Sequence, residues 1–300
     1  MQIYTSSLLN LYEELNARKT LCPKDAQKLS QLRKGHIGES QWLSLLNKSS
    51  ITEAKLLNGL VLIVNDQTLQ MDTLLIRPDA LYLYEVKNYK GVYLNGTDTI
   101  TSINGNEYVN PLLQLSRTSI QLRQWLKYNR FSIPVKAFVV YINSDFTLYN
   151  ANETEPVILP TQINAHLKQL STHTLPLTDK HDRLFQMLCS AHQTEAAFQR
   201  KLPTYTFEEL KKCVSCLECH SLSICLTERK YYCQTCHSVG PIAKLVIKQV
   251  EDFRLLFPRS RITTAVIYDW CNGRIPKKRI WTVLKTNFIK MGSGKGTYYE

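Results

Sequence analysis

The sequence lacks any apolar run of membrane-spanning length. Its apolar stretches, such as residues 60–64 and 137–142, fall far short of the roughly 18 to 20 residues that a membrane-crossing helix needs. The first residues lack the basic start, apolar stretch and small-residue cleavage site of a secretory signal. Intrinsic disorder as the dominant state is excluded, because 44% of the residues are hydrophobic and 21% are charged. We therefore expect a soluble, cytoplasmic protein of one large domain or several smaller ones.

Acidic residues are scarce in the last third of the chain. Of the formal charge of +12, residues 201–300 carry most, with 17 Lys and Arg against 8 Asp and Glu. A basic module favours polyanions, above all nucleic acid, because each phosphate that Lys or Arg neutralises releases condensed counterions. The alternative is a solvated basic surface, and charge alone does not decide between the two.

Cysteine is the residue type with the clearest pattern. The chain has nine cysteines, an odd number, and no export signal, so a disulfide framework is not expected. Cys216-x2-Cys219 and Cys233-x2-Cys236 offer four thiolates as two tight turns separated by 13 residues, which is the spacing of a tetrahedral structural zinc site. The residues between the two turns alternate like strands. The segment resembles a zinc ribbon, which we place at residues 211–240.

Three further side chains leave the zinc ligands open. Cys213 also forms a pair of the right spacing with Cys216, and His220 or His237 could replace one thiolate. Each turn, Cys-x2-Cys-His, matches the attachment pattern of c-type haem as well. Haem attachment requires export to an oxidising compartment, for which the sequence has no signal, so zinc is the prediction.

The first 200 residues predict an α/β domain. A helical extension at residues 1–32 precedes a helix whose first turn, at residues 34–39, contains two glycines and Glu39. The turn signal Asn104-Gly105 predicts a small hairpin. The other expected elements are strands at 59–64, 69–76, 80–87 and 135–142 and helices at 161–170 and 182–200.

A further helix is expected to begin at Asn110-Pro111, because Pro in a first turn sacrifices no intrahelical hydrogen bond. Its predicted apolar stripe comprises Leu112, Leu115, Ile120, Leu122, Trp125 and Leu126. The order of all these elements predicts an α/β sandwich of about 200 residues, a normal size for one domain.

Two acids and a lysine form a candidate catalytic set. Glu85 and Lys87 lie two positions apart on an expected strand, so they share one face while Val86 points into the opposite core. A neighbouring strand carries Asp72 toward the same face. Phosphodiester hydrolysis uses such a set, since carboxylates hold Mg²⁺ and a lysine orients or deprotonates the attacking water. A harmless same-face ion pair is the alternative, although charges on an otherwise apolar strand are costly.

Four motifs surround these residues: Gly-His-Ile-Gly-Glu at 35–39, Gln-Met-Asp at 70–72, Tyr-Glu-Val-Lys-Asn-Tyr-Lys-Gly at 84–91 and Asn-Pro-Leu-Leu-Gln at 110–114. In this order and spacing they resemble the nuclease-related domain, NERD, a branch of the PD-(D/E)xK nuclease superfamily. The similarity covers roughly residues 33–145. It implies a restriction-endonuclease-like α/β sandwich, which we place at residues 33–200.

The resemblance also implies roles for five residues. Glu39, Asp72 and Glu85 would supply metal-binding carboxylates, with Mg²⁺ or Mn²⁺ at Asp72 and Glu85. Lys87 would be the catalytic ammonium and Gln114 a polar contact from the following helix. The usual Pro-Asp pair is here Met-Asp. The simpler alternatives are that Glu39 only complements a helix dipole and that Gln114 is only a solvated helix residue.

The last 60 residues, 241–300, are similar to a winged helix-turn-helix. Helices are expected at 242–257, 261–271 and 276–285, followed by a Gly-rich hairpin at 288–299. The third helix of such a module enters the major groove. The predicted nucleic-acid contacts are Arg274, Lys277, Lys278, Arg279 and Lys295. A solvated basic turn is the alternative.

Together these features predict a Mg²⁺-dependent nuclease that a zinc ribbon and a winged helix deliver to DNA, with RNA not excluded. One alternative is a DNA-binding or regulatory protein whose NERD-like domain only clamps nucleic acid. Another is a scaffold whose zinc ribbon and winged helix contact protein partners.

Overall fold

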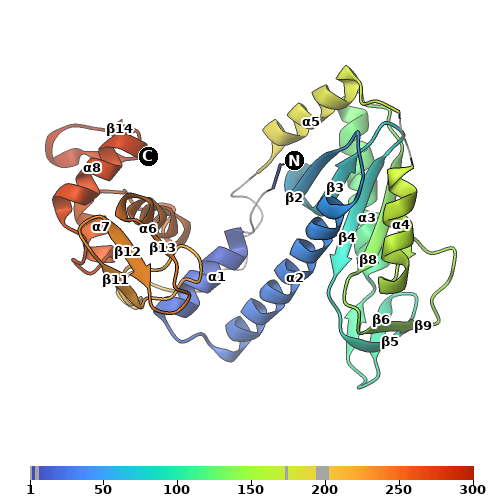
Figure 1. Ribbon diagram of the computed structural model, residues 1–300, viewed down its shortest axis with the longest axis horizontal. Coiled ribbons are helices and arrows are strands. Elements are labelled where there is room, and N and C mark those ends of the chain that lie inside the picture. The colour runs from blue at the N-terminus through green and yellow to red at the C-terminus, as the bar shows by residue number, and fades with distance from the viewer. Residues whose placement is uncertain (1, 4–6, 173–174, 194–202) are drawn as a thin grey trace. The chain divides into compact units, whose positions relative to one another are not determined.

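The structure is a computed structural model that describes residues 2–3, 7–172, 175–193 and 203–300 (Figure 1). The chain divides into two compact units. Unit 1 comprises Met1–Ser6 and Gln31–Leu202, and unit 2 comprises Ser7–Ser30 and Pro203–Glu300. Among the residues described, no helix combines the length and the apolar character needed to cross a bilayer.

Unit 1 is built on a mixed six-stranded sheet in the order β1-β2-β3-β4-β8-β10. β2, β3 and β4, at the positions of three predicted strands, form an antiparallel meander, and β8 joins β4 in parallel. The turn between β2 and β3 is Asn65-Asp66, whose φ angles of 49° and 59° suit the type I′ turn of a tight hairpin. The strands are β1 (Gln2–Ile3), β2 (Lys55–Val64), β3 (Gln67–Ile76), β4 (Leu81–Lys87), β8 (Val135–Tyr141) and β10 (Val157–Ile158).

Helices cover both faces of this sheet. On one face, Leu122 of α3 and Leu188 of α5 pack in the same core as Leu83 of β4. On the other face, α2 and α4 pack against the sheet, and the Trp42 ring lies 4.9 Å from that of Tyr84. The helices are α2 (Pro23–Lys48), α3 (Pro111–Tyr128), α4 (Ile163–Ser171), which follows the short 3-10 helix η1 (Pro160–Gln162), and α5 (Asp179–Ala191).

A second, four-stranded sheet, β7-β6-β5-β9, completes unit 1. β6 and β7 form the predicted hairpin, in which Gly105 adopts a φ of 80°. The side chain of Asn110 then caps α3 by accepting a hydrogen bond from the amide of Leu112 at 2.9 Å. The strands are β5 (Gly91–Asn95), β6 (Thr99–Ser102), β7 (Glu107–Val109) and β9 (Phe146–Tyr149).

Three expectations for unit 1 need correction. α2 begins at Pro23, where Pro occupies a first turn, so Glu39 lies inside the helix. Gly38 serves close packing, because a Cβ there would lie 2.8 Å from the Cβ of Asn88. Ile120 is 49% exposed and does not belong to the buried stripe of α3. α5 begins at Asp179, and residues 194–200 of the expected helix lie outside the described residues.

Unit 2 combines a three-stranded antiparallel sheet, β11-β12-β13, with helices α6, α7 and α8. β14 pairs with β15, and Ile262 forms a bridge to Tyr299. α1 also belongs to this unit, and the Arg18 guanidinium lies 3.8 Å from the ring centre of Trp270. The elements are α1 (Ser7–Arg18), β11 (Ile224–Leu226), β12 (Lys230–Cys233), β13 (Val239–Pro241), α6 (Ile242–Leu256), α7 (Thr264–Trp270), α8 (Lys277–Asn287), β14 (Lys290–Met291), the 3-10 helix η2 (Gly294–Gly296) and β15 (Tyr298–Tyr299).

Candidate active site and metal centre

The candidate active site lies where β3 and β4 separate. Backbone pairing between these strands ends at Thr73 and Tyr84, and the next pair in the same register is Asp72 and Glu85. Residues that oppose each other in an antiparallel pair share a face of the sheet. Asp72 Oδ2 accepts a hydrogen bond from the Val86 amide at 2.9 Å. The carboxylate thus takes the place of a backbone partner and is held at the fork between the strands.

An irregularity in β2 accompanies this position. Gly59 has a φ of 67°, and the register of β2 and β3 puts it opposite Asp72. Leu57 and Leu60 enter the same core although they are three positions apart, which regular alternation along a strand does not allow. The left-handed conformation, which glycine adopts without steric cost, switches the faces of β2 at this point.

Lys87 connects the strand to helix α3. Its Nζ donates to Glu85 Oε1 at 2.6 Å and to Gln114 Oε1 at 3.1 Å. Glu85 is only 4% exposed, while Val86 points into the core on the opposite face. The structure therefore brings Asp72, Glu85, Lys87 and Gln114 together, from β3, β4 and α3.

Glu39 reaches the same place from the interior of α2. Burial and the Asp72 and Glu85 carboxylates raise the pKa of Glu39 to about 8, which the nearby Lys87 only partly offsets. Because this effect requires proximity, all of the five residues singled out by the motifs lie in one region. We call Glu39, Asp72, Glu85 and Lys87 the acidic site.

The pKa values in the acidic site reflect an excess of negative charge. Burial and the Asp72 carboxylate raise the pKa of Glu85 to about 7, and burial raises the pKa of Asp72. Burial lowers the pKa of Lys87, but the Glu85 and Asp72 carboxylates together raise it above its ordinary value. The ammonium therefore stays charged at neutral pH. Three partly or fully buried carboxylates with one ammonium form a set whose repulsion a divalent cation would relieve.

Unit 2 contains a candidate metal centre of four cysteines. The sulfur atoms of Cys216, Cys219, Cys233 and Cys236, the cysteine cluster, all lie within 4.8 Å of one another. The Cys216–Cys236 and Cys219–Cys233 sulfur distances are both 3.6 Å. Four Zn–S bonds of about 2.3 Å in a tetrahedron place the sulfur atoms about 3.8 Å apart, so the cluster fits zinc.

The other candidate ligands are turned elsewhere. His220 and His237 each follow the second cysteine of a turn and adopt positive φ angles of 57° and 61°. Their Nδ1 atoms lie 2.6 Å from Glu14 Oε1 and 2.6 Å from the Tyr232 hydroxyl. Cys213 Sγ accepts a hydrogen bond from Arg274 at 3.5 Å. These three side chains flank the cysteine cluster and are not part of it.

The two candidate centres differ in how far they are assembled. Among the residues that the structure describes, the cysteine cluster is the group in which at least three potential metal ligands have their ligand atoms within 4.8 Å of one another. The acidic site is looser, since Lys87 holds Glu85 and the Val86 amide holds Asp72. The Asp72 carboxylate is close enough to raise the pKa values of Glu39 and Glu85, but the three carboxylates are not gathered around a common point.

The basic residues near α8 have several different environments. The guanidinium of Arg274 donates to the carbonyl oxygen of Ile224, and that of Arg279 donates to the carbonyl oxygen of Glu228. Both arginines therefore support the cysteine-rich segment. Lys277 lies over the Tyr268 ring at 4.8 Å, and Lys278 is exposed. The side chain of Lys295 lies outside the described residues.

Sequence reasoning missed one residue next to the acidic site. Tyr89 is half-buried; burial and Glu85 raise its pKa, while Lys87 acts against them. Its ring stacks on that of Tyr93 with the centres 5.5 Å apart. Tyr89 lies two positions after Lys87, just beyond the end of β4, so its place in the same motif was the available signal.

The comparisons with known proteins bear on unit 1. Residues 34–142 match the family model described as nuclease-related domain, NERD. The matched segment contains the whole acidic site together with Gln114, and the mixed α/β architecture is consistent with a nuclease-like domain. Neither the curated proteins nor the solved structures gave a match. This part of the chain is thus similar to nuclease-related domains.

Proposed function

We propose that this protein is a metal-dependent nuclease of the PD-(D/E)xK type that hydrolyses phosphodiester bonds of DNA. The observation that carries the proposal is the convergence of Asp72, Glu85 and Lys87 at the fork between β3 and β4. It lies in a segment similar to nuclease-related domains. The raised pKa values of Glu39 and Glu85 support it, since strongly perturbed acids cluster at functional sites.

Each residue would have a defined task. Mg²⁺ or Mn²⁺ bound by Asp72 and Glu85, with Glu39 alongside, would polarise the scissile phosphate and activate water. The Val86 amide fixes the orientation of the Asp72 carboxylate. Lys87 is held by Glu85 and Gln114 and remains protonated, so it acts as a fixed positive charge for the developing negative charge on the phosphate rather than as a base.

Unit 2 would deliver the nuclease domain to its substrate. We propose structural zinc at the cysteine cluster, whose sulfur spacing fits that metal. Helices α6, α7 and α8 with the β14–β15 pair would form a winged helix-turn-helix, with Lys277 and Lys278 at the start of α8 available for phosphates. Arg274 and Arg279 would act mainly by holding the cysteine-rich segment against α8.

The test is cleavage of plasmid and linear DNA, and of RNA, by the full chain with Mg²⁺ or Mn²⁺. Asp72→Asn and Lys87→Ala should each lower the rate by about 10² to 10³-fold while the fold persists in circular dichroism. Lys90→Ala is the matched control, because Lys90 is exposed, lies three positions after Lys87 and pairs with Asp145.

Cleavage that survives both variants, or that needs no divalent cation, would contradict the proposal. Binding with a steep salt dependence but no cleavage in either metal would assign the nuclease-like domain the role of a clamp. Cleavage of RNA with DNA left intact would show that the substrate is RNA and not DNA.

A further inference from the structure

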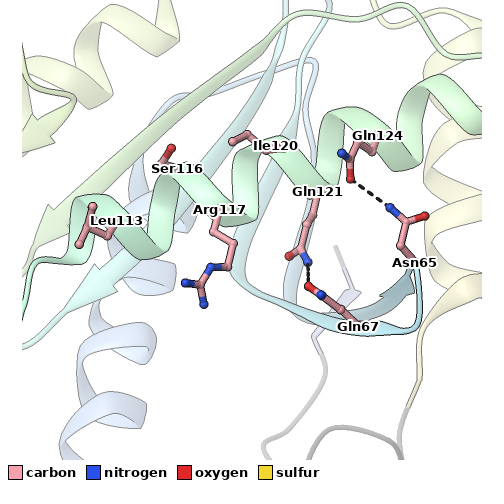
Figure 2. Close-up of a pocket in the computed structure, with 8 residues that line it drawn as sticks. All are labelled: Asn65, Gln67, Leu113, Ser116, Arg117, Ile120, Gln121 and Gln124. Carbon is pink, nitrogen blue, oxygen red and sulfur yellow. Dashed lines mark hydrogen bonds between the residues drawn. The ribbon is translucent and has the colours of Figure 1, made fainter.

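A groove lies along the outer side of α3, next to the turn between β2 and β3 (Figure 2). Its volume is about 500 Å³. Two amide pairs connect its walls: Gln121 donates to Gln67 at 2.9 Å, and Asn65 donates to Gln124 at 3.3 Å. The lining residues, which define the α3 groove, are Asn65, Gln67, Leu113, Ser116, Arg117, Ile120, Gln121 and Gln124.

The α3 groove begins beside the acidic site. Gln114, which accepts the hydrogen bond from Lys87, lies one helical turn before Arg117, and Arg117 lies one turn before Gln121. In Figure 2, Arg117 and Gln121 extend from the same side of α3. The opposite wall is the end of the hairpin whose second strand carries Asp72. A strand with a phosphate at the acidic site could therefore continue along the groove.

The chemistry of the lining is unusual for a surface that meets a duplex. Arg117 is the one charged residue among the eight, and five others are neutral and polar. Leu113 and Ile120 are 43% and 49% exposed. A duplex presents mainly phosphates, and proteins that bind it along its backbone use several cations. An unpaired strand also exposes the faces and edges of its bases, which apolar side chains and amides contact.

We propose that the α3 groove binds an unpaired segment of nucleic acid next to the scissile phosphate. The Arg117 guanidinium contacts a backbone phosphate, and Leu113 and Ile120 lie under bases. The amides of Gln121, Gln124, Asn65 and Gln67 are available to base edges. This inference rests on the proposed function, which places the scissile phosphodiester at the acidic site. It specifies that the substrate of the nuclease has a single-stranded or frayed end.

The experiment measures binding of the full chain to labelled oligonucleotides of about 15 nucleotides by fluorescence anisotropy. Single-stranded DNA, single-stranded RNA and a blunt DNA duplex of the same sequence are compared without added Mg²⁺ or Mn²⁺. Arg117→Ala should weaken single-strand binding about fivefold and lower the slope of log affinity against log salt by about 0.7. Arg123→Ala is the matched control, since Arg123 is exposed on α3 and does not line the groove.

A second variant tests the apolar contacts. Ile120→Glu places a negative charge in the groove at a half-exposed position that the fold tolerates, and it should weaken single-strand binding more than duplex binding. Equal effects of Arg117→Ala and Arg123→Ala, or a larger effect of Arg117→Ala on the duplex, would overturn the proposal. If the variants lose affinity for single-stranded DNA and single-stranded RNA equally, the result supports the proposal and indicates that the groove does not recognise the sugar.

The outcomes separate this proposal from the nuclease function. If Lys87→Ala abolishes cleavage while Arg117→Ala and Ile120→Glu leave single-strand binding unchanged, the groove proposal fails and the nuclease proposal stands. If these two variants weaken single-strand binding but no form of the chain cleaves, the groove proposal stands and the nuclease proposal fails.

Discussion

The two units each contain a buried cluster of charges, and the clusters differ in the balance of positive and negative groups. The acidic site of unit 1 has three carboxylates and one ammonium. In unit 2, Glu14 accepts hydrogen bonds from Arg18 at 3.1 Å and Lys248 at 2.9 Å, and Lys248 donates to Asp252 at 2.6 Å. We call these four residues the buried ion cluster. It has two carboxylates and two cations, with His220 beside Glu14.

The difference shows in the pKa values. Although burial opposes it, the contacts with His220, Lys248 and Arg18 lower the pKa of the fully buried Glu14 to about 2. Asp252, with fewer cationic contacts, has a pKa that burial and Glu14 raise to about 6. Glu39 and Glu85 of the acidic site are higher, at about 8 and about 7.

A balanced cluster and an unbalanced one serve different purposes. The buried ion cluster connects α1, α6 and the first cysteine turn, and all of its charges have partners inside unit 2. Such a cluster fixes packing. The acidic site has an excess of carboxylates, whose repulsion is relieved by protonation or by an added cation, and this is the pattern of a binding or catalytic site.

The largest expected effect comes from Glu14→Gln. The substitution leaves Arg18 and Lys248 buried with one carboxylate fewer, so unit 2 should lose about 3 to 5 kcal/mol of unfolding free energy. Native-state hydrogen exchange of the α6 amides measures the loss. The matched variant Glu39→Gln should leave the exchange of β4 unchanged or slower, because it removes repulsion. Destabilisation of both units to the same extent would contradict the difference between the two clusters.

Mg²⁺ and Mn²⁺ should act on unit 1 alone. Mg²⁺ or Mn²⁺ at about 100 times its dissociation constant should raise the unfolding free energy of unit 1 by about 2.7 kcal/mol. The β4 amides would show the gain in hydrogen exchange, and Asp72→Asn should remove it. The α6 amides serve as an internal control, and a gain of similar size there would indicate that the cation does not bind at the acidic site.

The pH dependence of the two units should diverge above pH 6. Folded Glu85 and Glu39 keep protons up to about pH 7 and about pH 8, whereas an unfolded glutamate releases its proton near 4.5. The folded form therefore binds more protons, and the stability of unit 1 falls as pH rises from about 4.5 to 8. In unit 2, Asp252 gives such a fall only up to about pH 6, and Glu14 loses its contribution only as pH drops toward 2.

Hydrogen exchange between pH 6.5 and 8, corrected for intrinsic rates, separates the two cases. The β4 amides should lose protection over this range and the α6 amides should not. Glu39→Gln should reduce the loss in β4, because one of the two titrating groups is removed. A slope that is the same in both units, or that Glu39→Gln leaves intact, would contradict the assigned excess of carboxylates.

Much of the acidic site follows from local rules. The alternation of β4 is sufficient to put Glu85 and Lys87 on one face and Val86 on the other. The tight turn at residues 77–80, in which the Arg77 amide donates to the Ala80 carbonyl oxygen at 3.1 Å, fixes the pairing of β3 and β4 that brings Asp72 opposite Glu85. Period-two patterning and turn chemistry act over a few residues, so a single sequence contains them.

Contacts between distant residues account for what the sequence did not predict. The close packing of α2 at Gly38 is against Asn88, which lies 50 positions later. Glu14 bonds with His220 and Lys248, more than 200 positions away, and no local pattern marks such a pair. The exposure of Ile120 likewise depends on which side of α3 the sheet covers, since helical spacing defines a stripe only approximately.

The smallest effect concerns two neighbouring cations at the start of α8. Arg279 is half-buried and its guanidinium donates to the Glu228 carbonyl oxygen, whereas Lys278 is exposed. Arg279→Ala should lower the unfolding free energy of unit 2 by about 1.5 kcal/mol, because the hydrogen bond of a charged group is lost. Lys278→Ala should leave stability within about 0.5 kcal/mol. It should instead weaken duplex binding and lower its salt slope by about 0.9, as expected for one phosphate contact. If the two variants exchanged these effects, the roles assigned to the two cations, support of the fold by Arg279 and phosphate contact by Lys278, would be wrong.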